Sequence, residues 1–372
     1  MKKVSVAILT EHRARNFGSC LQVYALQETL KSMGVDATIV DYRPQAIEDS
    51  FGIFIKDLYN ESKSNIINLI SFYIKTIVFF PKRYMREKKF EEFRNNYYHL
   101  TKNVYTDDNI NDNNLCFDIY FYGSDQIWNP KITKGLCDAY FGVPFDRDAI
   151  HASYAASIGL SHLNNEEANF REKLKFLDYI SVREETAKEL IQNLTDKDVK
   201  VVLDPTLIVN RNIWFDMVKN VKIKEKYILV YSLKVDTSLI EYVKKLSAEK
   251  NLKVVFFDLK KRYGKNCISD FSADPQDFIS YVKHADYIVT NSFHGTVFSV
   301  LFEKKFICVP MEGTSSRMIN LLENLKLTDR LYSDNCNIDE EINYKTVNNN
   351  LLSLKKESID FLERVINSYE QN

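Results

Sequence analysis

The side chains best suited to chemistry lie in the run Ser292-Phe293-His294-Gly295-Thr296, which follows the apolar segment 287–290. This pattern predicts a short β-strand that ends abruptly, with a helix over 296–302. Such a junction presents unpaired backbone N–H groups and the positive end of the helix dipole, so it binds anions. An imidazole there adds a charge or a proton. The junction predicts a phosphate site; the alternative is a capped turn in which His294 only hydrogen-bonds the scaffold.

Polar residues follow three further predicted strands in the same way. They are Gly123-Ser124-Asp125-Gln126 after 118–122, Arg183-Glu184 after 179–182, and Asp204-Pro205-Thr206 after 199–203. An α/β sheet usually binds its ligand at the carboxyl ends of its strands. Arg183 can supply a planar fork for a carboxylate or phosphate, which Lys cannot reproduce. The alternative is an ion pair of Arg183 with Glu184 or a nearby Asp.

The elements that position these residues alternate between strand and helix. Residues 4–10 predict a buried strand, 16–19 a turn, 21–33 an amphipathic helix ended by Gly34, and 37–42 a second parallel strand. The alternation restarts near residue 206 with strands at 227–231 and 253–258 and helices at 239–250 and 278–283. We therefore predict an N-terminal domain over 1–205, with a helical insertion at about 50–110, and a C-terminal domain over 206–372 whose long last helix packs back on the first domain.

Composition excludes several classes of protein. The 372 residues carry a formal net charge of -1, which argues against a general nucleic-acid binder. Six cysteines are scattered without CxxC pairs, so they predict reduced thiols in a reducing compartment rather than a zinc site or disulfides. Charged residues at 11–13 interrupt the first apolar run, so a strand explains it better than a signal peptide. A cytoplasmic location is expected.

The segment from Ile66 to Lys89 departs from this alternation. It begins with an apolar and aromatic stretch over 66–80 and continues into a basic run over 81–89. The stretch is too short and too polar to span a bilayer. It suits a helix lying on an anionic membrane surface, peripheral at the inner face. A helical hairpin packed on its own domain is the alternative.

Taken together, the ordered motifs resemble those of the polysaccharide pyruvyl transferase family. The resemblance covers about residues 4 to 330, and the departures are Phe17 in place of Tyr and Ile158 in place of an aromatic residue. The matching motifs are Asn16-Phe17-Gly18-Ser19 with Leu21-Gln22 and Tyr24-Ala25-Leu26, Gly123 to Asn129, Tyr154 to Gly159, Ser181-Val182-Arg183-Glu184, Asp204-Pro205-Thr206-Leu207, and Ser292 to Thr296.

The resemblance implies an α/β fold of two Rossmann-like domains facing a central cleft, similar to GT-B glycosyltransferases. It implies phosphoenolpyruvate as donor and transfer of the pyruvyl group, as a ketal, to two hydroxyls of one sugar with release of phosphate. The expected setting is bacterial cell-surface polysaccharide biosynthesis, such as exopolysaccharide or capsule. A lipid-linked acceptor is a hypothesis drawn from the segment 66–89. No nucleotide cofactor and no obligatory metal are expected, since P-loop, Gly-x-Gly-x-x-Gly and Asp-x-Asp patterns are missing from the sequence.

The resemblance also gives roles to residues. Arg183 is expected to hold the donor carboxylate, and His294 the phosphate with the Gly295 and Thr296 amides and Ser292 beside them. Asp125 is the candidate general base or hydroxyl orienter; its alternative is a helix N-cap, a role that suits Ser124 as well. The remaining expected binding residues are Asn16, Gly18, Ser19, Gly123 and, adding charge to the donor pocket, Arg317.

Two other functions stay open from the sequence. A GT-B glycosyltransferase with a nucleotide-sugar donor would share the predicted architecture. A non-catalytic sugar-binding or anion-binding protein would keep the fold, and substitutions at Arg183 or His294 would then change binding with no turnover to lose.

Overall fold

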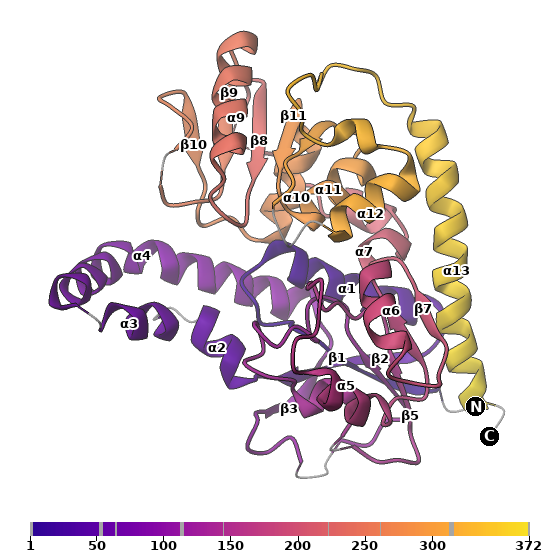
Figure 1. The fold of residues 1–372 in the computed structure, drawn as a ribbon. Coiled ribbons are helices and arrows are strands. Elements are labelled where there is room, and N and C mark those ends of the chain that lie inside the picture. Colours follow the sequence, from indigo (N-terminus) through magenta and orange to yellow (C-terminus); the bar gives the residue numbers. More distant parts are fainter. Residues whose placement is uncertain are drawn as a thin grey trace. The chain divides into compact units, whose positions relative to one another are not determined.

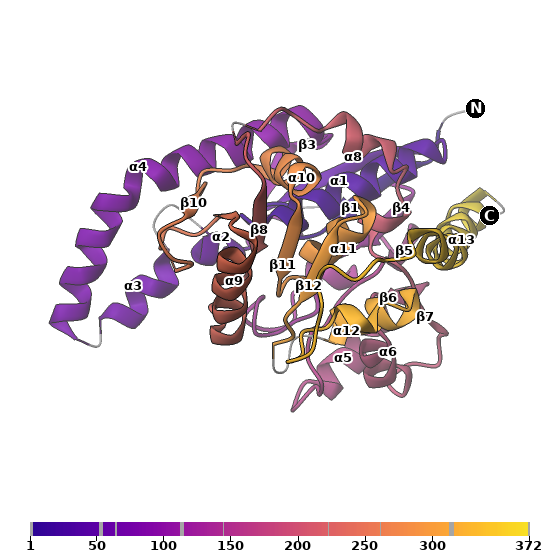
Figure 2. The same ribbon diagram turned by 90° about the horizontal axis from the view of Figure 1, so that it is seen from above.

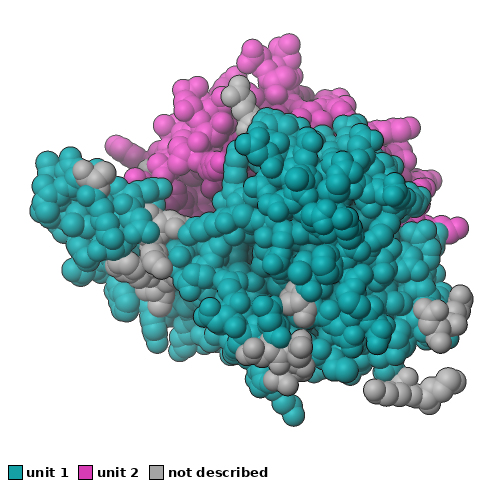
Figure 3. Space-filling model, turned by 60° about the horizontal axis from the view of Figure 1, so that its bottom comes forward, with its two compact units in different colours: residues 1–205, 359–372 teal, residues 206–358 magenta. Residues whose placement is uncertain are grey.

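The computed structural model describes residues 3–51, 55–63, 65–111, 115–143, 145–221, 223–260, 262–311 and 316–370. Residues 52–54 and 64 of the predicted insertion lie outside the described residues. The chain divides into two compact units, residues 1–205 with 359–372 and residues 206–358, which are coloured teal and magenta in Figure 3.

The first unit is built on a parallel sheet in the order β3-β2-β1-β4-β5 (Figure 1). A second parallel pair, β6-β7, lies beside β5 through single bridges from Ala152 to Tyr179 and from Ala156 to Val182. The carboxyl ends of β1, β4, β6 and β7 therefore meet at one edge. The strands are β1 (Ser5–Leu9), β2 (Asp36–Tyr42), β3 (Leu100–Tyr105), β4 (Ile119–Tyr122), β5 (Ile150–Ser153), β6 (Ile180–Val182) and β7 (Val199–Val201).

The first helix begins earlier than the sequence pattern predicts. Helix α1 (Phe17–Ser32) includes the predicted turn 16–19, because the Asn16 side chain caps it. The Gly18 and Ser19 N–H groups donate to Asn16 Oδ1 at 2.9 and 3.3 Å, which satisfies two amides that a helix start leaves without partners. The other helices of this unit are α2 (Gln45–Phe51), α3 (Lys56–Ser62), α4 (Ile66–Tyr97), α5 (Glu167–Leu174) and α6 (Glu185–Gln192).

Helices α2 to α4 form an arm that extends away from the sheet of the first unit (Figures 1 and 2). The last turns of α4 anchor it, since Phe90 stacks on Phe17 of α1 with ring centroids 5.7 Å apart. Tyr97 contacts Tyr24 at 5.3 Å. Among the helices that the structure describes, none is both long enough and apolar enough to cross a membrane.

The second unit repeats the parallel design in the order β10-β9-β8-β11-β12. The short strands β3, β5 and β10 were missing from the sequence prediction because they carry little apolar periodicity. The elements after β7 are α7 (Pro205–Ile208), α8 (Asn212–Asp216), β8 (Tyr227–Tyr231), α9 (Thr237–Lys250), β9 (Lys253–Phe256), β10 (Cys267–Ser269), α10 (Pro275–His284), β11 (Tyr287–Thr290), α11 (Phe293–Leu301), β12 (Lys305–Cys308) and α12 (Ser316–Leu325).

The long last helix, α13 (Tyr344–Glu370), ends on the first unit, as the sequence predicted. Phe361 contacts Tyr154 with ring centroids 6.3 Å apart, and the Arg364 guanidinium lies 5.8 Å from the ring centroid of Tyr179. The Tyr369 hydroxyl donates to Asp118 at the start of β4. These contacts explain why 359–372 group with the first unit.

Two buried histidines should make the first unit sensitive to acid. Burial lowers the pKa of His151 and, despite the hydrogen bond to Asp41, that of His12. The Tyr122 hydroxyl donates to His151 Nδ1 at 2.7 Å, and Nε2 donates to the Asp146 carbonyl at 2.7 Å. One ring nitrogen accepts and the other donates, which is the hydrogen-bonding pattern of a neutral imidazole.

Because the folded state then binds fewer protons than the unfolded state, stability should fall as pH drops below about 6.5. We expect the urea midpoint to decrease from pH 7 to pH 5, with a smaller decrease in His151→Gln. The exposed His162→Gln provides the control. If the urea midpoint of His151→Gln falls between pH 7 and pH 5 as much as that of wild type, His151 is not a source of the acid sensitivity.

Candidate functional site

A buried ion-pair cluster occupies the ligand edge of the first unit. Arg183, just after β6, donates from Nη1 to Asp204 Oδ2 at 2.7 Å, and its Nη2 lies 3.4 Å from Asp125 Oδ1. Ser124 Oγ donates to the same oxygen of Asp204 at 3.2 Å. The Arg183 side chain is 1% exposed. Polar residues that follow β4, β6 and β7 therefore meet in one cluster, although β6 and β7 pair in a sheet of their own.

The charges of this cluster decide what Arg183 can do. Burial alone would lower its pKa, but Asp204 and Asp125 outweigh burial and hold the pKa above its ordinary value. Two carboxylates face one guanidinium, so the cluster carries no surplus positive charge for a ligand anion. The ion pair with a nearby Asp, which the sequence left as an alternative, is what the structure contains. The predicted contact of Arg183 with a donor carboxylate stays a prediction.

The cluster and helix α1 fix the Asp125 carboxylate from several sides. Ser19 Oγ donates to Oδ2, and the Gln126 N–H donates to Oδ1 at 3.0 Å. Asp125 has φ 74°, a left-handed backbone that non-glycine residues seldom adopt and that often marks functional sites. Residues 126–128 form a bend and turns rather than a helix, so the N-cap alternative for Ser124 and Asp125 is wrong.

Asp125 lies in the wall of a cavity of about 320 Å³, a volume within the range of small-molecule pockets. Asn16 and Ser19, which the sequence predicted as cleft residues, also line it. Eight of the ten lining residues carry polar or charged groups of both signs, which can hydrogen-bond a ligand rich in hydroxyls. The remaining lining residues are Glu11, Ala14, Ser50, Gln126, Lys131, Ile132 and Lys134.

The other predicted residues of the first unit support this cavity instead of lining it. Gly18 contributes its N–H to the cap on Asn16. Gly123 has φ 123°, and a Cβ there would lie 2.4 Å from the Tyr154 carbonyl oxygen, so only glycine fits. Ser124 is fully buried, and its carbonyl accepts from Thr10 Oγ1 at 2.7 Å.

Two further motif residues, Glu184 and Asp204, have structural contacts that the sequence did not indicate. The Glu184 carboxylate accepts from Ser157 Oγ and from the Ile158 and Gly159 N–H groups at 2.9 to 3.2 Å, which holds the loop after β5. Asp204 received no role from the sequence, yet it is the main partner of Arg183. The sequence feature that could have identified Asp204 is a carboxylate placed directly after a predicted strand.

In the second unit, the His294 turn is the first turn of a helix. Helix α11 begins at Phe293 instead of residue 296, because Ser292 is its N-cap. The Gly295 N–H donates to Ser292 Oγ at 3.4 Å, and the Thr296 N–H donates to the Ser292 carbonyl at 3.0 Å. These two amides, which the resemblance assigned to the phosphate, are thus engaged within the turn.

Side-chain packing explains two more motif residues. A Cβ on Gly295 would lie 2.1 Å from Thr290 Oγ1, so glycine lets α11 approach β11. The Thr296 hydroxyl donates to the Ser292 carbonyl at 3.2 Å and lies 3.0 Å from Cys308 Sγ. Both positions are structural in this unit.

The structure brings Arg317 to the His294 turn, from the first turn of α12. Its guanidinium lies 6.0 Å from the ring centroid of Phe293, and the Phe293 and His294 rings meet edge to face at 5.2 Å. His294 itself is buried, with 6% of its surface exposed. A cation and an imidazole therefore flank Phe293 at the positive end of α11, a combination suited to an anion.

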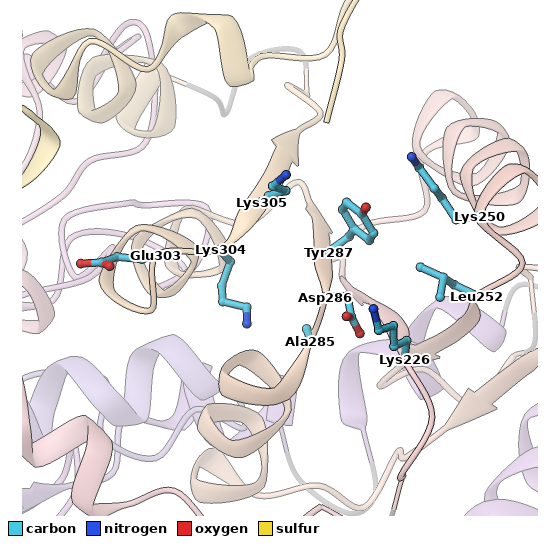
Figure 4. A pocket seen from close by; sticks show the side chains of 9 residues that line it. All are labelled: Lys226, Lys250, Leu252, Ala285, Asp286, Tyr287, Glu303, Lys304 and Lys305. Atoms are coloured by element: carbon cyan, nitrogen blue, oxygen red, sulfur yellow. The ribbon is translucent and has the colours of Figure 1, made fainter. Parts of the chain in front are cut away.

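A separate cavity of about 510 Å³ lies at the opposite edge of the same sheet (Figure 4). Lys226, Asp286 and Lys305 stand before or at the amino ends of β8, β11 and β12, whereas His294 follows the carboxyl end of β11. Two of its lysines are paired, Lys250 with Asp339 and Lys305 with Glu341. This cavity is therefore distinct from the predicted site.

Comparison with known proteins gives one sequence match and a group of similar folds. The sequence profile of the polysaccharide pyruvyl transferase family matches residues 16–312. No curated protein matches the chain significantly. A crystal structure of UDP-N-acetylglucosamine 2-epimerase aligns with a TM-score of 0.54 and 12% identity, covering 100% of this chain and 98% of that chain.

Two further structures align with TM-scores below 0.5. The putative UDP-N-acetylglucosamine 2-epimerase of Listeria monocytogenes gives 0.48 with 13% identity, covering 97% of this chain and 90% of that chain. MurG of Acinetobacter baumannii gives 0.39 with 9% identity and full coverage of both chains. The likeness to the epimerase structure with the TM-score of 0.54 concerns the fold alone. Together with the two parallel five-stranded sheets, it confirms the predicted GT-B-like α/β class with two Rossmann-like domains.

Proposed function

The chain belongs to the polysaccharide pyruvyl transferase family, and on that premise we propose that it transfers the pyruvyl group of phosphoenolpyruvate to two hydroxyls of one sugar. The product is a cyclic ketal in a polysaccharide precursor. The observation that carries the proposal is the Asp125 carboxylate, held by Ser19 and Gln126 in the wall of a cavity at the ligand edge of its sheet.

The reaction defines what the site must do. Two C–O bonds form between C2 of the donor and the sugar oxygens, and the C2–O bond to phosphate breaks. Of the two hydroxyl protons, one goes to C3, which becomes a methyl group, and the other leaves with the phosphate. A base near the acceptor hydroxyls and a positive site near the departing phosphate are therefore needed.

We assign the acceptor to the cavity of the first unit. Asp125 takes a proton from an attacking hydroxyl, and Asn16 and Lys131 on the same wall supply hydrogen bonds to the sugar. The polar and charged side chains of the cavity can hydrogen-bond the hydroxyls of a sugar. They come from the loop after β1, from α1 and α2, and from the loop after β4.

We assign the donor phosphate to the start of α11 in the second unit. His294 and Arg317 lie there on either side of Phe293, and the helix dipole adds positive potential. His294 would bind the phosphate and, as it departs, donate a proton to the leaving oxygen.

Arg183 has a role that follows from its ion pairs. Nη1 is held by Asp204, and Nη2 faces Asp125, so we assign Arg183 to positioning the base and stabilising its charge. Direct capture of the donor carboxylate remains the competing role. Arg183→Lys separates them: positioning shifts the pH profile of kcat/KM for the acceptor, whereas capture raises KM for phosphoenolpyruvate and leaves that profile in place.

The function is tested by phosphate release from phosphoenolpyruvate in the presence of a panel of sugar acceptors. We expect release only with both substrates, and His294→Asn should lower kcat/KM by roughly 10- to 150-fold, the value of a charge-assisted hydrogen bond of about 1.5–3 kcal/mol. The exposed His284→Asn in the same unit is the matched control and should keep full activity.

A nucleotide-sugar transferase would give a different result. In that case a nucleoside diphosphate would raise the melting temperature strongly and phosphoenolpyruvate would leave it unchanged. That pattern, or release of phosphate at equal rates in wild type and His294→Asn, would overturn the proposed function.

A further inference from the structure

The outer face of helix α4 exposes an unusual amount of apolar surface. Ten large apolar side chains on this helix are between 45% and 72% exposed. Outside the arm, the exposed large apolar residues among those described are scattered singly over both units. The ten are Ile66, Ile67, Ile70, Tyr73, Ile74, Ile77, Val78, Phe80, Tyr84 and Met85. Such a contiguous patch marks an interaction surface.

These side chains form one stripe along the helix, here called the apolar stripe. At 100° per residue they cover about 160° of the helix circumference. The neighbouring face carries Phe72, which is buried and contacts Tyr59 of α3 at 5.7 Å. Helix α3 therefore covers one side of α4 and touches the apolar stripe at Tyr73, whose ring centroid lies 6.2 Å from that of Tyr59. The helical hairpin that the sequence left as an alternative is present, but it leaves the rest of the apolar stripe exposed.

Basic residues border the apolar stripe. Between Ile66 and Lys89 there are six Lys and Arg residues and one Glu, in a chain whose formal net charge is -1. Lys75, Lys82 and Lys89 are seven residues apart and therefore follow one margin of the stripe. An apolar face with cations along its margin is the pattern of a helix that lies in an anionic bilayer surface, with lysines reaching the headgroups.

The arm is built to present this face. The C-terminal turns of α4 are fixed by the ion pairs of Glu87 with Arg15 at 2.8 Å and with Arg94 at 3.1 Å. Arg86 lies over the rings of Phe17 and Phe90 at 5.3 and 5.2 Å. The N-terminal turns extend beyond these anchors, away from the sheet of the first unit (Figure 2).

We propose that the α3–α4 arm docks the protein on an anionic lipid surface, with the apolar stripe at the acyl boundary and Lys75 and Lys82 at the headgroups. The proposal goes beyond the transfer reaction and rests on its own observations. Its consequence for the proposed function is that docking would bring the protein to acceptors that are presented at a membrane surface.

A second copy of the chain fits this face less well. Several stripe residues recur at spacings of three and four, as in a two-helix seam, but the stripe is wider than such a seam. The charged residues that flank such a seam are Arg83 and Lys88, which are both cations, so paired helices would bring like charges together. The charges favour a negatively charged surface over a copy of the same helix.

The experiment is sedimentation of the full chain with vesicles at low salt, comparing phosphatidylcholine alone with phosphatidylcholine containing a quarter phosphatidylglycerol. Wild type should bind the anionic vesicles and release at high salt. Ile74→Glu/Ile77→Glu should weaken this binding by roughly tenfold or more, because the bilayer loses two apolar side chains that would enter it and meets two charges instead. Lys75→Glu/Lys82→Glu should lose the preference for anionic vesicles.

The matched control is Val235→Glu/Leu352→Glu, which adds the same charge at positions 62% and 63% exposed outside the arm. It should bind like wild type, and circular dichroism should show all variants folded. Equal losses in the control and the arm variant would overturn the proposal. So would failure of wild type to bind, or a wild-type dimer that Ile74→Glu/Ile77→Glu converts to monomer without any vesicle binding.

Discussion

The Asp125→Asn substitution is expected to slow pyruvyl transfer by about 10²- to 10⁴-fold, the usual contribution of a general base. The amide keeps the shape of the carboxylate and can still accept from Ser19 Oγ or the Gln126 N–H, so the cavity should persist. What is lost is the ability to take a proton from the acceptor hydroxyl. The measurement is kcat/KM for the acceptor at saturating phosphoenolpyruvate, with circular dichroism and urea unfolding as checks on the fold.

Two further variants test this prediction. Asp198→Asn removes an exposed carboxylate of the same unit and should leave the rate unchanged. Ser19→Ala removes one hydrogen bond that positions Asp125 and should shift the acid limb of the pH profile while retaining part of the rate. If Asp125→Asn keeps more than a tenth of the wild-type kcat/KM, Asp125 is not the base.

The second large effect is expected from Arg183→Met, which should lower the free energy of unfolding by about 3–5 kcal/mol. The side chain is buried with Asp204 and Asp125, and its removal leaves two buried carboxylates without the cation that both of them contact. Urea unfolding at pH 7 measures the loss. A surface ion pair offers the comparison: Lys200→Met breaks the exposed pair with Asp198 and should cost less than about 1 kcal/mol.

A double variant tests the cause. Arg183→Met/Asp204→Asn removes one of the stranded carboxylates, so it should recover part of the lost stability. If the double variant is as unstable as the sum of the two single variants, the residues act independently. A loss of less than 1 kcal/mol in Arg183→Met would likewise show that the ion pairs are not what holds this edge of the sheet.

The sequence predicted the elements with strong periodicity and missed the short ones. The strand at 227–231 is observed with the same limits as β8 (Tyr227–Tyr231), because five consecutive apolar residues suit only a buried strand. Strand β3 (Leu100–Tyr105) has a mostly exposed middle and gave no such signal. Helix starts were placed too late at α1 and α11, since Asn16 and Ser292 were taken as turn residues when each is an N-cap.

For the candidate site, the sequence alone located the polar residues at the strand ends, and it located them in order. The local pattern of apolar and polar residues is enough to locate them, because a buried parallel strand ends where polar residues begin, and the carboxyl ends of parallel strands lie at the same edge of their sheet. It also gave the family through the ordered motifs. These conclusions need no knowledge of which side chains touch.

The tertiary structure decided the partners. Sequence separations of 21 residues between Arg183 and Asp204 and of 106 between Ser19 and Asp125 are bridged only by sheet order and helix packing. Those contacts placed Arg183 in a buried cluster, gave Asp204 a role, and fixed Asp125 at a cavity wall. The packing of α3 on α4, which covers one face of α4 and leaves the other exposed, is likewise a property of the tertiary structure. The physical reason is that burial and charge pairing depend on neighbours that the local chain does not contain.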